Sequence, residues 1–425
     1  MKKCFLTLLS AAALAVSAAP ASAPAPAPAQ SAPARPAVPV PPMLKMTLPE
    51  VIYAVPGIES NIYFENVVDT AVYRSYACEV RCLRGAQGEH RWFWTPTEKD
   101  AGKSFDLELR LFNDYGMVVS AKCKVVVAGP AADPKQKFTL ALLAASGVNC
   151  GYPAHLLTVM REKGFSNYTP IGSHSGGGRP VVPGGVAHDG YGGFSWNSFL
   201  TRWAYSFEEL PGPQNKAEEE QMRALGVTKL PKSQAYRLRS PLLRLKDGKP
   251  VLDIPAWLQK INGGKAPDYI VIQLGGNDMF GARPEQLDEK VTKVMENART
   301  LLAELRKHAP RAVIGVATEP CGCGQDGFGA NYGCAQSKYQ FRRNAQRYNR
   351  ELDALIKGLK DPRIVILPLH QSIDPENSFI TGSVKAHARS EKKVRRDRNA
   401  LHPSVEGGRQ FGDAIACWLI KQRER

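Results

Sequence analysis

The chain has 425 residues, of which 43% are hydrophobic and 23% charged, an ordinary balance for globular protein, and this length predicts two or three domains. Its formal net charge at pH 7 is +16. Because no stripe of Lys and Arg carries interleaved aromatic residues, we predict no nucleic-acid binding. The positive field favours anionic substrates or an acidic cell envelope instead.

The N-terminus has the pattern of a signal peptide. Lys2 and Lys3 precede an apolar run over residues 5–19, and small residues suited to cleavage follow at Ala21-Ser-Ala23. The run is too short to span a membrane, so we expect residues 1–23 to direct export to the periplasm or the extracellular space. Residues 24–43 are a Pro/Ala string without an apolar period, which predicts an extended linker.

Residues 44–130 are typical of a small all-β domain. Alternation is clear in Phe105-Asp-Leu-Glu-Leu-Arg-Leu-Phe112, and the spacing of the segments predicts an immunoglobulin-like β-sandwich. Cys78 and Cys82 share one face of their strand, and either could meet Cys123 across the sandwich, since export permits disulfides. The predicted strands are Ile52–Val55, Ser60–Phe64, Tyr73–Arg81, His90–Thr95, Phe105–Asn113 and Val118–Val127.

Residues 137–425 alternate between strand and helix patterns. This order predicts an α/β domain with an open parallel sheet and helices on both faces, of flavodoxin-like type. Residues 206–264 are a long insertion for which we assign no elements. The predicted strands are Phe138–Ala144, Asp268–Leu274, Ala312–Thr318 and Arg363–Leu369, and the predicted helices are Pro153–Lys163, Leu287–His308, Tyr339–Lys357 and Gly408–Lys421.

Polar residues follow the strands of this domain. Ser146 comes after the first strand, Asn277 and Asp278 follow Gly275-Gly276, and His402 precedes the last helix. Ligands gather at the carboxyl ends of strands in open α/β sheets. A serine, backbone donors, an asparagine amide and a histidine are the groups that acyl transfer requires. The alternatives are that Ser146 is a loop hydroxyl without a role and that His402 is a helix-entry residue.

Four segments, in this order, resemble the SGNH (GDSL-type) hydrolases, in particular exported bacterial members with an N-terminal β-sandwich. Gly275-Gly-Asn-Asp278 matches the GxND motif, Leu401-His-Pro403 matches the last block, and Gly193-Phe-Ser195 resembles the second. The resemblance implies that Ser146 is the nucleophile and His402 the base. It further implies that Gly193 and Asn277, with the Ser146 amide, hold the oxyanion.

Two positions depart from the family pattern. Ala144-Ala145 stand where the Gly and Asp of the GDS motif are expected, and Asn399 stands where the Asp of DxxH is expected. Asn399 can orient His402 through its carbonyl oxygen but cannot stabilise an imidazolium with charge. Asp397 is an alternative partner, and a Ser146–His402 dyad is another.

The remaining cysteines suggest structure more than chemistry. Cys321, Cys323 and Cys334 would need a fourth ligand for a structural zinc site, and none is obvious locally. We therefore favour a loop disulfide and predict no metal. Cys150 could be a disulfide half that pins the nucleophile loop.

Three further features complete the sequence-based hypothesis. His188 is predicted to hydrogen-bond its own glycine loop, and Asp278 to brace its loop. The basic run Lys385–Arg398 is predicted to be a solvated loop that could attract an anionic substrate. We expect an exported, cofactor-free serine ester hydrolase that removes acetyl or other short acyl groups from carbohydrate or another small ester; the carbohydrate rests on family analogy and export. The alternative is a non-catalytic carbohydrate-binding or envelope protein on the same fold.

Overall fold

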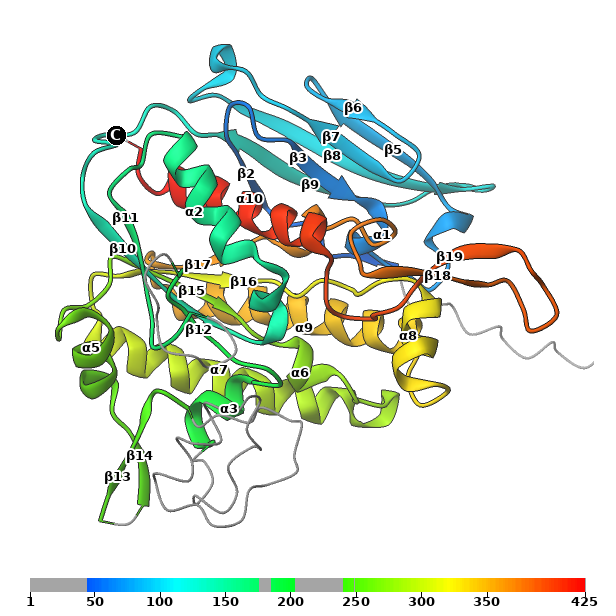
Figure 1. The fold of residues 1–425 in the computed structure, drawn as a ribbon. Helices are drawn as coiled ribbons and strands as arrows, with labels where there is room; N and C mark the ends of the chain where they lie inside the picture. Colours follow the sequence, from blue (N-terminus) through cyan, green and yellow to red (C-terminus); the bar gives the residue numbers. More distant parts are fainter. Residues whose placement is uncertain (1–43, 176–184, 203–239, 248, 425) are drawn as a thin grey trace, which may run out of the picture. The chain divides into compact units, whose positions relative to one another are not determined.

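The computed structural model describes residues 44–175, 185–202, 240–247 and 249–424. The predicted signal peptide (1–23) and linker (24–43) lie outside the described residues. Leu44–Arg425 form one compact unit, within which an N-terminal all-β region packs against an α/β region (Figure 1). None of the helices in the described ranges is long and apolar enough to cross a membrane.

The N-terminal region is built from β-sheets, as predicted. A four-stranded sheet has the order β2-β9-β8-β5 and a three-stranded sheet the order β3-β7-β6, while β1 pairs with β4. All pairings are antiparallel except that of β2 with β9. The elements are β1 Lys45–Met46, β2 Val51–Ala54, β3 Ser60–Tyr63, α1 Phe64–Val67, β4 Val68–Asp69, β5 Ala77–Cys82, β6 Ala86–Gln87, β7 Arg91–Trp94, β8 Ser104–Asn113 and β9 Gly116–Val127.

The α/β region contains the predicted open parallel sheet. Its strand order is β11-β10-β15-β16-β17, and the short β12 pairs with the end of β10. Every pairing in this sheet is parallel, so the strands end at one common edge. The strands are β10 Phe138–Ala144, β11 Tyr168–Ile171, β12 Asp189–Gly190, β15 Tyr269–Gln273, β16 Val313–Ala317 and β17 Ile364–Leu367.

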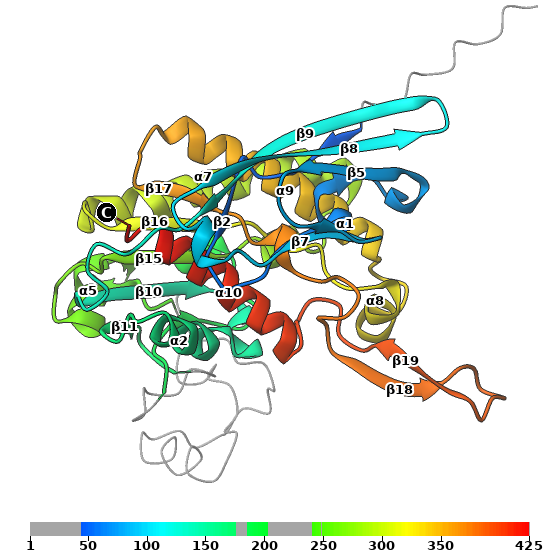
Figure 2. The ribbon, with the colours of Figure 1, turned by 90° about the horizontal axis from the view of Figure 1, so that it is seen from above.

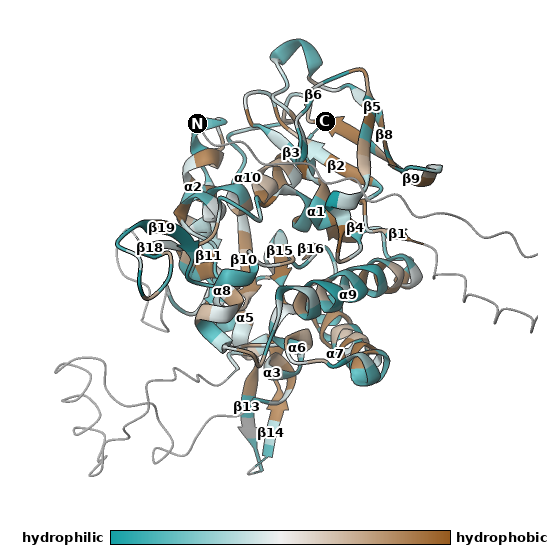
Figure 3. Ribbon diagram, turned by 90° about the vertical axis from the view of Figure 1, so that its right-hand side faces the viewer, coloured by the Kyte–Doolittle hydropathy of each residue, from teal (hydrophilic) through white to brown (hydrophobic). Residues whose placement is uncertain are grey.

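Helices cover both faces of this sheet. Successive strand residues point to opposite faces, so Ile270 and Ile272 pack with α3, α5, α7 and α9, whereas Val271 packs with α2 and α10 (Figure 1). The long α7 and α9 show brown and teal along their length in Figure 3, as expected for amphipathic helices. The helices are α2 Tyr152–Glu162, α3 Trp196–Thr201, α5 Ile254–Asn262, α6 Gly276–Met279, α7 Leu287–His308, α8 Gln325–Tyr332, α9 Lys338–Leu359 and α10 Val405–Lys421.

Two hairpins fall where no strand was predicted. In the insertion, β13 (Leu243–Lys246) pairs with β14 (Lys249–Leu252) ahead of α5. The basic run, predicted to be a loop, is instead largely an antiparallel hairpin of β18 (Thr381–Lys385) and β19 (Lys393–Asp397), which projects from the body (Figure 2). Its strands pair Val384 with Val394, two β-branched residues that favour strands in a segment dominated by charge.

The predicted disulfide of the β-region is wrong, because the cysteines lie in one sheet and not across a sandwich. Leu107 of β8 pairs with both Cys82 on β5 and Cys123 on β9, so two strand spacings separate these cysteines. That separation is about 9–10 Å, beyond the roughly 7 Å between Cα atoms that a disulfide can bridge. Cys78 lies farther along β5 and is likewise a free thiol.

The predicted disulfides of the α/β region are also absent from the described residues. Cys321 and Cys323 are buried free thiols, and Cys334 is exposed and free. Cys150 contributes to the nucleophile turn in another way, because its thiol donates a hydrogen bond to the Gly147 carbonyl oxygen at 2.7 Å. Among the described side chains, no group of three or more His, Cys, Asp and Glu could hold a metal ion.

Buried polar contacts join the β-region to the α/β region. Glu65 of α1 forms ion pairs with Lys338 and Arg342 at the start of α9, and Arg342 also donates to the carbonyl oxygen of Val68 at 2.6 Å. Glu65 and Arg342 are each only 4% exposed. The junction is therefore held by desolvated charges that are paired.

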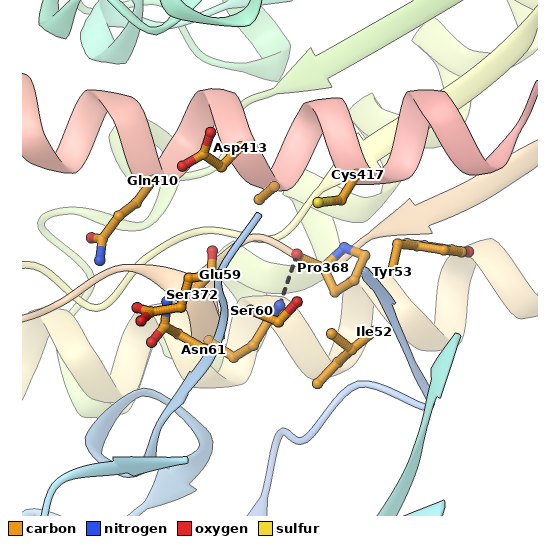
Figure 4. Close-up of a pocket in the computed structure, with 12 residues that line it drawn as sticks. Ile52, Tyr53, Glu59, Ser60, Asn61, Pro368, Ser372, Gln410, Asp413 and Cys417 are labelled. Carbon is orange, nitrogen blue, oxygen red and sulfur yellow. Dashed lines mark hydrogen bonds between the residues drawn. The ribbon is translucent and has the colours of Figure 1, made fainter. Parts of the chain in front are cut away.

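A pocket lies between β2, β3, the loop after β17 and α10. In Figure 4 Gln410 and Asp413 of α10 face Glu59, Ser60 and Asn61 of the β-region across it. The lining of this pocket does not include Ser146, Asn277 or His402, so it is separate from the site described next.

Candidate active site

Ser146 lies at the carboxyl end of β10, where strand changes to turn. The backbone N–H of Ala145 donates to the Gln273 carbonyl oxygen on β15 at 3.1 Å, and Ser146 then opens a 3₁₀ turn over Ser146–Cys150. Gly151 follows with φ +85°, a conformation that favours glycine, and leads into α2. The turn thus presents the Ser146 side chain at the common edge of the sheet.

The departure at Ala144-Ala145 has a packing explanation. Their side chains are 0% and 8% exposed and belong to the two hydrophobic cores on either side of the sheet. An aspartate at position 145 would need a polar partner there. The Gln273 side chain packs beside the turn, and its oxygen lies so close to Gly147 that an added Cβ would stand 2.9 Å from it.

His402 meets Ser146 from the other end of the chain. The His402 Nε2 and Ser146 Oγ atoms are 2.8 Å apart. Burial lowers the pKa of His402, so the ring is neutral near pH 7 and Nε2 can accept the serine proton when Nδ1 carries the hydrogen. This is the geometry of a nucleophile and its general base.

Asn399 lies behind His402 but does not contact its ring. Its side-chain oxygen accepts the backbone N–H groups of Leu401, at 3.1 Å, and His402, at 2.9 Å. No hydrogen bond joins the Asn399 side chain to the imidazole, because its oxygen is turned to these two backbone N–H groups. The structure therefore corrects the expected contact: Asn399 holds the His402 backbone and not its Nδ1.

Asp397 is turned away from the site. Its carboxylate accepts the Gly324 backbone N–H at 3.0 Å, and burial raises its pKa. No described carboxylate hydrogen-bonds His402, so within these residues Ser146 and His402 form a dyad.

Asn277 lies in the same cavity as Ser146 and His402. Gly275, with φ +133°, turns the chain from β15 into the short α6 that carries Asn277. One N–H of its amide donates to the Phe194 carbonyl oxygen at 2.8 Å. An amide nitrogen carries two hydrogens, so a second donor is left for an oxyanion.

Gly193 lies beside the cavity but is not among the residues that line it. The loop that carries it is fixed to the end of β10, because β12 pairs with β10 and the Tyr191 N–H donates to the Ala144 carbonyl oxygen at 3.0 Å. Gly193 has φ +72°, in the region that favours glycine.

Asp278 braces this loop. Both of its carboxylate oxygens lie 3.2 Å from the Trp196 N–H, and burial raises its pKa to about 7.

His188 takes part in structure. Its Nδ1 accepts the Gly190 N–H at 3.1 Å, within its own glycine loop. The ring packs edge-on against that of His174, with 4.6 Å between ring centroids. Burial lowers the pKa of His188 to about 4, so the ring is neutral at physiological pH.

Glu319 and Gln273 line the cavity and were missed by the sequence analysis. The Glu319 carboxylate accepts from the Gln273 side-chain amide at 3.2 Å and from the Gly276 N–H, and burial raises its pKa to about 7. Asn349 of α9 clamps its backbone, accepting from the Glu319 N–H at 2.8 Å and donating to its carbonyl oxygen at 2.9 Å. Glu319 follows β16, so the rule that placed Ser146 and Asn277 at strand ends could have found it.

An open parallel sheet that holds a serine–histidine pair at its carboxyl edge defines the class of α/β hydrolytic enzymes. The sequence pattern of the family described as GDSL-like Lipase/Acylhydrolase matches residues 176–415, more than half of the chain. The chain therefore belongs to this family and is an esterase of the GDSL type. The matched range contains Gly193, Asn277 and His402, whereas Ser146 lies before it.

Similar folds occur among solved structures. A family 3 carbohydrate esterase from Talaromyces cellulolyticus is 13% identical, with 67% of this chain and 97% of that chain covered and a TM-score of 0.37. A carbohydrate acetylesterase family member from Sinorhizobium meliloti is 11% identical, with 68% and 100% covered and a TM-score of 0.36. A family two carbohydrate esterase from Clostridium thermocellum is 12% identical, with 87% and 94% covered and a TM-score of 0.33. No curated protein matches this sequence.

Proposed function

We propose that this protein is an exported serine esterase that removes acetyl or other short acyl groups from a carbohydrate, with Ser146 as nucleophile and His402 as general base. The observation that carries the proposal is the 2.8 Å separation between Ser146 Oγ and His402 Nε2, in a cavity that Asn277 shares.

The reaction proceeds in two half-reactions. Ser146 Oγ attacks the ester carbonyl carbon while His402 Nε2 takes its proton, and the oxyanion is held by the amides of Ser146 and Gly193 and the side chain of Asn277. His402 then gives the proton to the leaving sugar oxygen as the C–O bond breaks, which leaves an acyl-serine. Water attacks that ester with His402 again as base, and the acid and free Ser146 are released.

The dyad leaves the imidazolium without a carboxylate partner among the described residues. In a triad, the acidic residue fixes the tautomer and stabilises the charge that forms on histidine. Here Asn399 fixes the His402 backbone but adds no charge. We therefore expect turnover well below that of a full triad, with the chemical step limiting.

The surroundings of Ser146 favour a short acyl group. The cavity measures about 490 Å³ including its mouth, and its apolar walls are formed by Pro320, Phe341, Leu401 and Phe411. Phe341 and Phe411 are each 2% exposed and are packed in the core, so the wall cannot withdraw for a long chain without disturbing the core. The carbohydrate and the export follow from the N-terminal sequence pattern and the family resemblance.

The test compares p-nitrophenyl acetate with the butyrate and octanoate esters. We expect wild type to prefer acetate, and Ser146→Ala to lower kcat by at least about 10³-fold. The control Ser166→Ala, at an exposed serine after α2, should retain wild-type kcat. Equal rates for wild type and Ser146→Ala would contradict the proposed function.

A further inference from the structure

The β18–β19 hairpin is a concentration of positive charge directly before His402. Residues 381–398 contain seven Lys and Arg against Glu391 and Asp397, which gives a net charge of +5. All seven basic residues are exposed. The hairpin is dark teal in Figure 3, the colour of strongly hydrophilic residues.

The two faces of the hairpin differ in how their charges are paired. On one face Arg396 forms an ion pair with Asp326 of α8 at 2.9 Å, which holds the hairpin against the body. The cross-strand register places Lys385, Lys393 and Arg395 together on the other face. Lys385 pairs with Glu391 at 2.8 Å, whereas no described acidic residue forms an ion pair with Lys393 or Arg395.

The charges on the face that carries Lys385, Lys393 and Arg395 destabilise the hairpin. Lys385 stands directly opposite Lys393 in the antiparallel ladder, and like charges in that position destabilise a strand pair. Such an arrangement is suited to binding a negative charge from outside the chain.

A groove lies between this face and the nucleophile turn, next to the catalytic cavity. Arg395 from the hairpin and Arg409 from α10 both line it, together with Asn149 and Cys150 of the nucleophile turn. Pro403, adjacent to His402, lines both the groove and the catalytic cavity. The groove is open to solvent along one side, and its empty space, with that solvent included, is about 1410 Å³ against about 490 Å³ for the cavity, so a polymer has room to lie along it.

The groove also contains an acidic residue, Glu406, which stays ionised close to its arginines. A hydrogen bond from Ser404 at 2.6 Å, and then the charges of Arg409 and Arg395, lower the pKa of Glu406. Counting Glu406 against both arginines leaves one positive charge in the groove, and Lys393 adds a second on the hairpin face that it shares with Arg395.

We propose that this groove and the Lys393–Arg395 face of the hairpin bind an acidic glycan that carries carboxylates, so that the substrate of the esterase is an acylated polyuronide. The substrate class rests on the proposed function, whereas the binding of the glycan does not require turnover. The planar forks of Arg395 and Arg409 match carboxylates in bidentate geometry. Repeated carboxylates along one polymer would meet the cations while an ester on the same chain enters the cavity.

The first experiment measures binding without catalysis. De-esterified oligogalacturonate and the neutral xylo-oligosaccharide of equal length are titrated into wild type, Ser146→Ala, the double variant Lys393→Glu/Arg395→Glu, and Lys290→Glu/Arg299→Glu. The last is a matched control, because Lys290 and Arg299 are exposed on α7, on the opposite face of the sheet from α10.

Oligogalacturonate is expected to bind wild type, Ser146→Ala and the α7 control alike, and to bind the hairpin variant about tenfold more weakly. Binding to wild type should also weaken between 10 mM and 150 mM salt, as screening shortens the Debye length from about 30 Å to about 8 Å. Equal affinity for the hairpin variant and wild type, or tighter binding of the neutral sugar, would overturn the proposal.

The second experiment measures acetate release from O-acetylated polygalacturonate, O-acetylated xylan and p-nitrophenyl acetate. For the hairpin variant, the ratio of kcat/KM on the acidic polymer to kcat/KM on p-nitrophenyl acetate should fall about tenfold, and the α7 control should keep the wild-type ratio. If wild type binds oligogalacturonate but hydrolyses none of the three esters, the proposed function is wrong and the glycan site stands. If the hairpin variant keeps the wild-type ratio of the two kcat/KM values, the glycan site is wrong and the esterase function stands.

Discussion

Two regions of the molecule that hold ionisable side chains out of water treat them differently. At the junction between the β-region and α9, the carboxylate of Glu65 is paired with Lys338 and Arg342, and the guanidinium of Arg342 also meets backbone carbonyl oxygens. At the carboxyl edge of the sheet, Glu319 and Asp278 are held only by neutral donors and have pKa values raised to about 7, and His402 has no described carboxylate partner.

The difference separates structural from chemical use of charge. In a buried ion pair each charge offsets part of the desolvation of the other, so the pair can serve as a structural contact. Groups that are desolvated without an opposite charge have shifted pKa values and can exchange protons near neutral pH. The paired cluster fixes the β-region on the α/β region, and the unpaired groups surround the nucleophile.

The largest expected effect is on catalysis, at the carboxyl edge of the sheet where His402 has no described carboxylate partner. His402→Ala removes the base that, among the described residues, contacts Ser146, and we expect kcat on p-nitrophenyl acetate to fall at least about 10³-fold. The exposed His387, in the hairpin turn, provides the control His387→Ala, which should retain wild-type kcat. Comparable rates for the two variants would contradict the role of His402.

A substitution at the junction between the β-region and α9 should lower the free energy of unfolding. Arg342→Met leaves the buried Glu65 with Lys338 alone and removes the donors to two backbone carbonyl oxygens, so we expect the free energy of unfolding to fall by about 3 kcal/mol. Urea unfolding measures this. Arg299→Met, at an exposed position of α7, is the control and should change stability by less than about 0.5 kcal/mol. A similar small change for both variants would show that the junction pairing contributes little.

The cavity carboxyl Glu319 should make stability depend on pH. Its pKa is about 7 in the folded protein against an ordinary 4.5, so between these values the folded state binds more protons, and stability is lost as pH rises through this window. Glu319→Gln removes that loss. Relative to wild type, the variant should gain about 1–2 kcal/mol in unfolding free energy on going from pH 5 to pH 8, less than the full pKa shift implies because the cavity is open to solvent.

The same urea titrations on Glu289→Gln, an exposed glutamate of α7, provide the control for Glu319→Gln. The control should track wild type at both pH values. If the Glu319→Gln curve also stays parallel to wild type from pH 5 to pH 8, the carboxyl is not desolvated in the folded protein.

The smallest expected effect is that of Asn399→Asp on kcat, and it distinguishes a Ser–His dyad from a triad. Aspartate can cap the same backbone N–H groups as Asn399, so Asn399→Asp should keep the local turn and change kcat by less than about tenfold. Its kcat/KM profile should retain the wild-type acid limb, which lies below pH 6.5 because burial lowers the pKa of His402. A gain of about 10³-fold with the limb moved upward would mean that the new carboxylate reaches the ring.

The regular elements of the α/β region were predictable because their signals are local. The apolar residues of α7 repeat at helical spacing, and the predicted helix Leu287–His308 agrees with the structure at both ends. The buried strands β10 and β15 are mostly apolar runs, and β15 lies between Pro267 and Gly275. Strand order then brought Ser146, Asn277 and His402 toward one edge.

What the sequence could not predict depends on contacts between distant residues. Nothing local reveals that Asp397 turns to Gly324. The Asn399 contact is the exception, because its oxygen is used by N–H groups only two and three residues later. The expected Cys123 disulfide failed because spacing along the chain does not say whether strands share a sheet or face each other. Glu319 was missed because no motif contains it, although it follows a strand as the other site residues do.

The most direct test of the central claim is labelling of the nucleophile. Wild type is incubated with an alkyl fluorophosphonate, digested and analysed by mass spectrometry, with His402→Ala in parallel. We predict one adduct per chain, on the peptide that contains Ser146, and strongly slowed labelling in His402→Ala because the serine proton then has no acceptor. An unlabelled Ser146, or an adduct on another serine at the same rate in both proteins, would contradict the account.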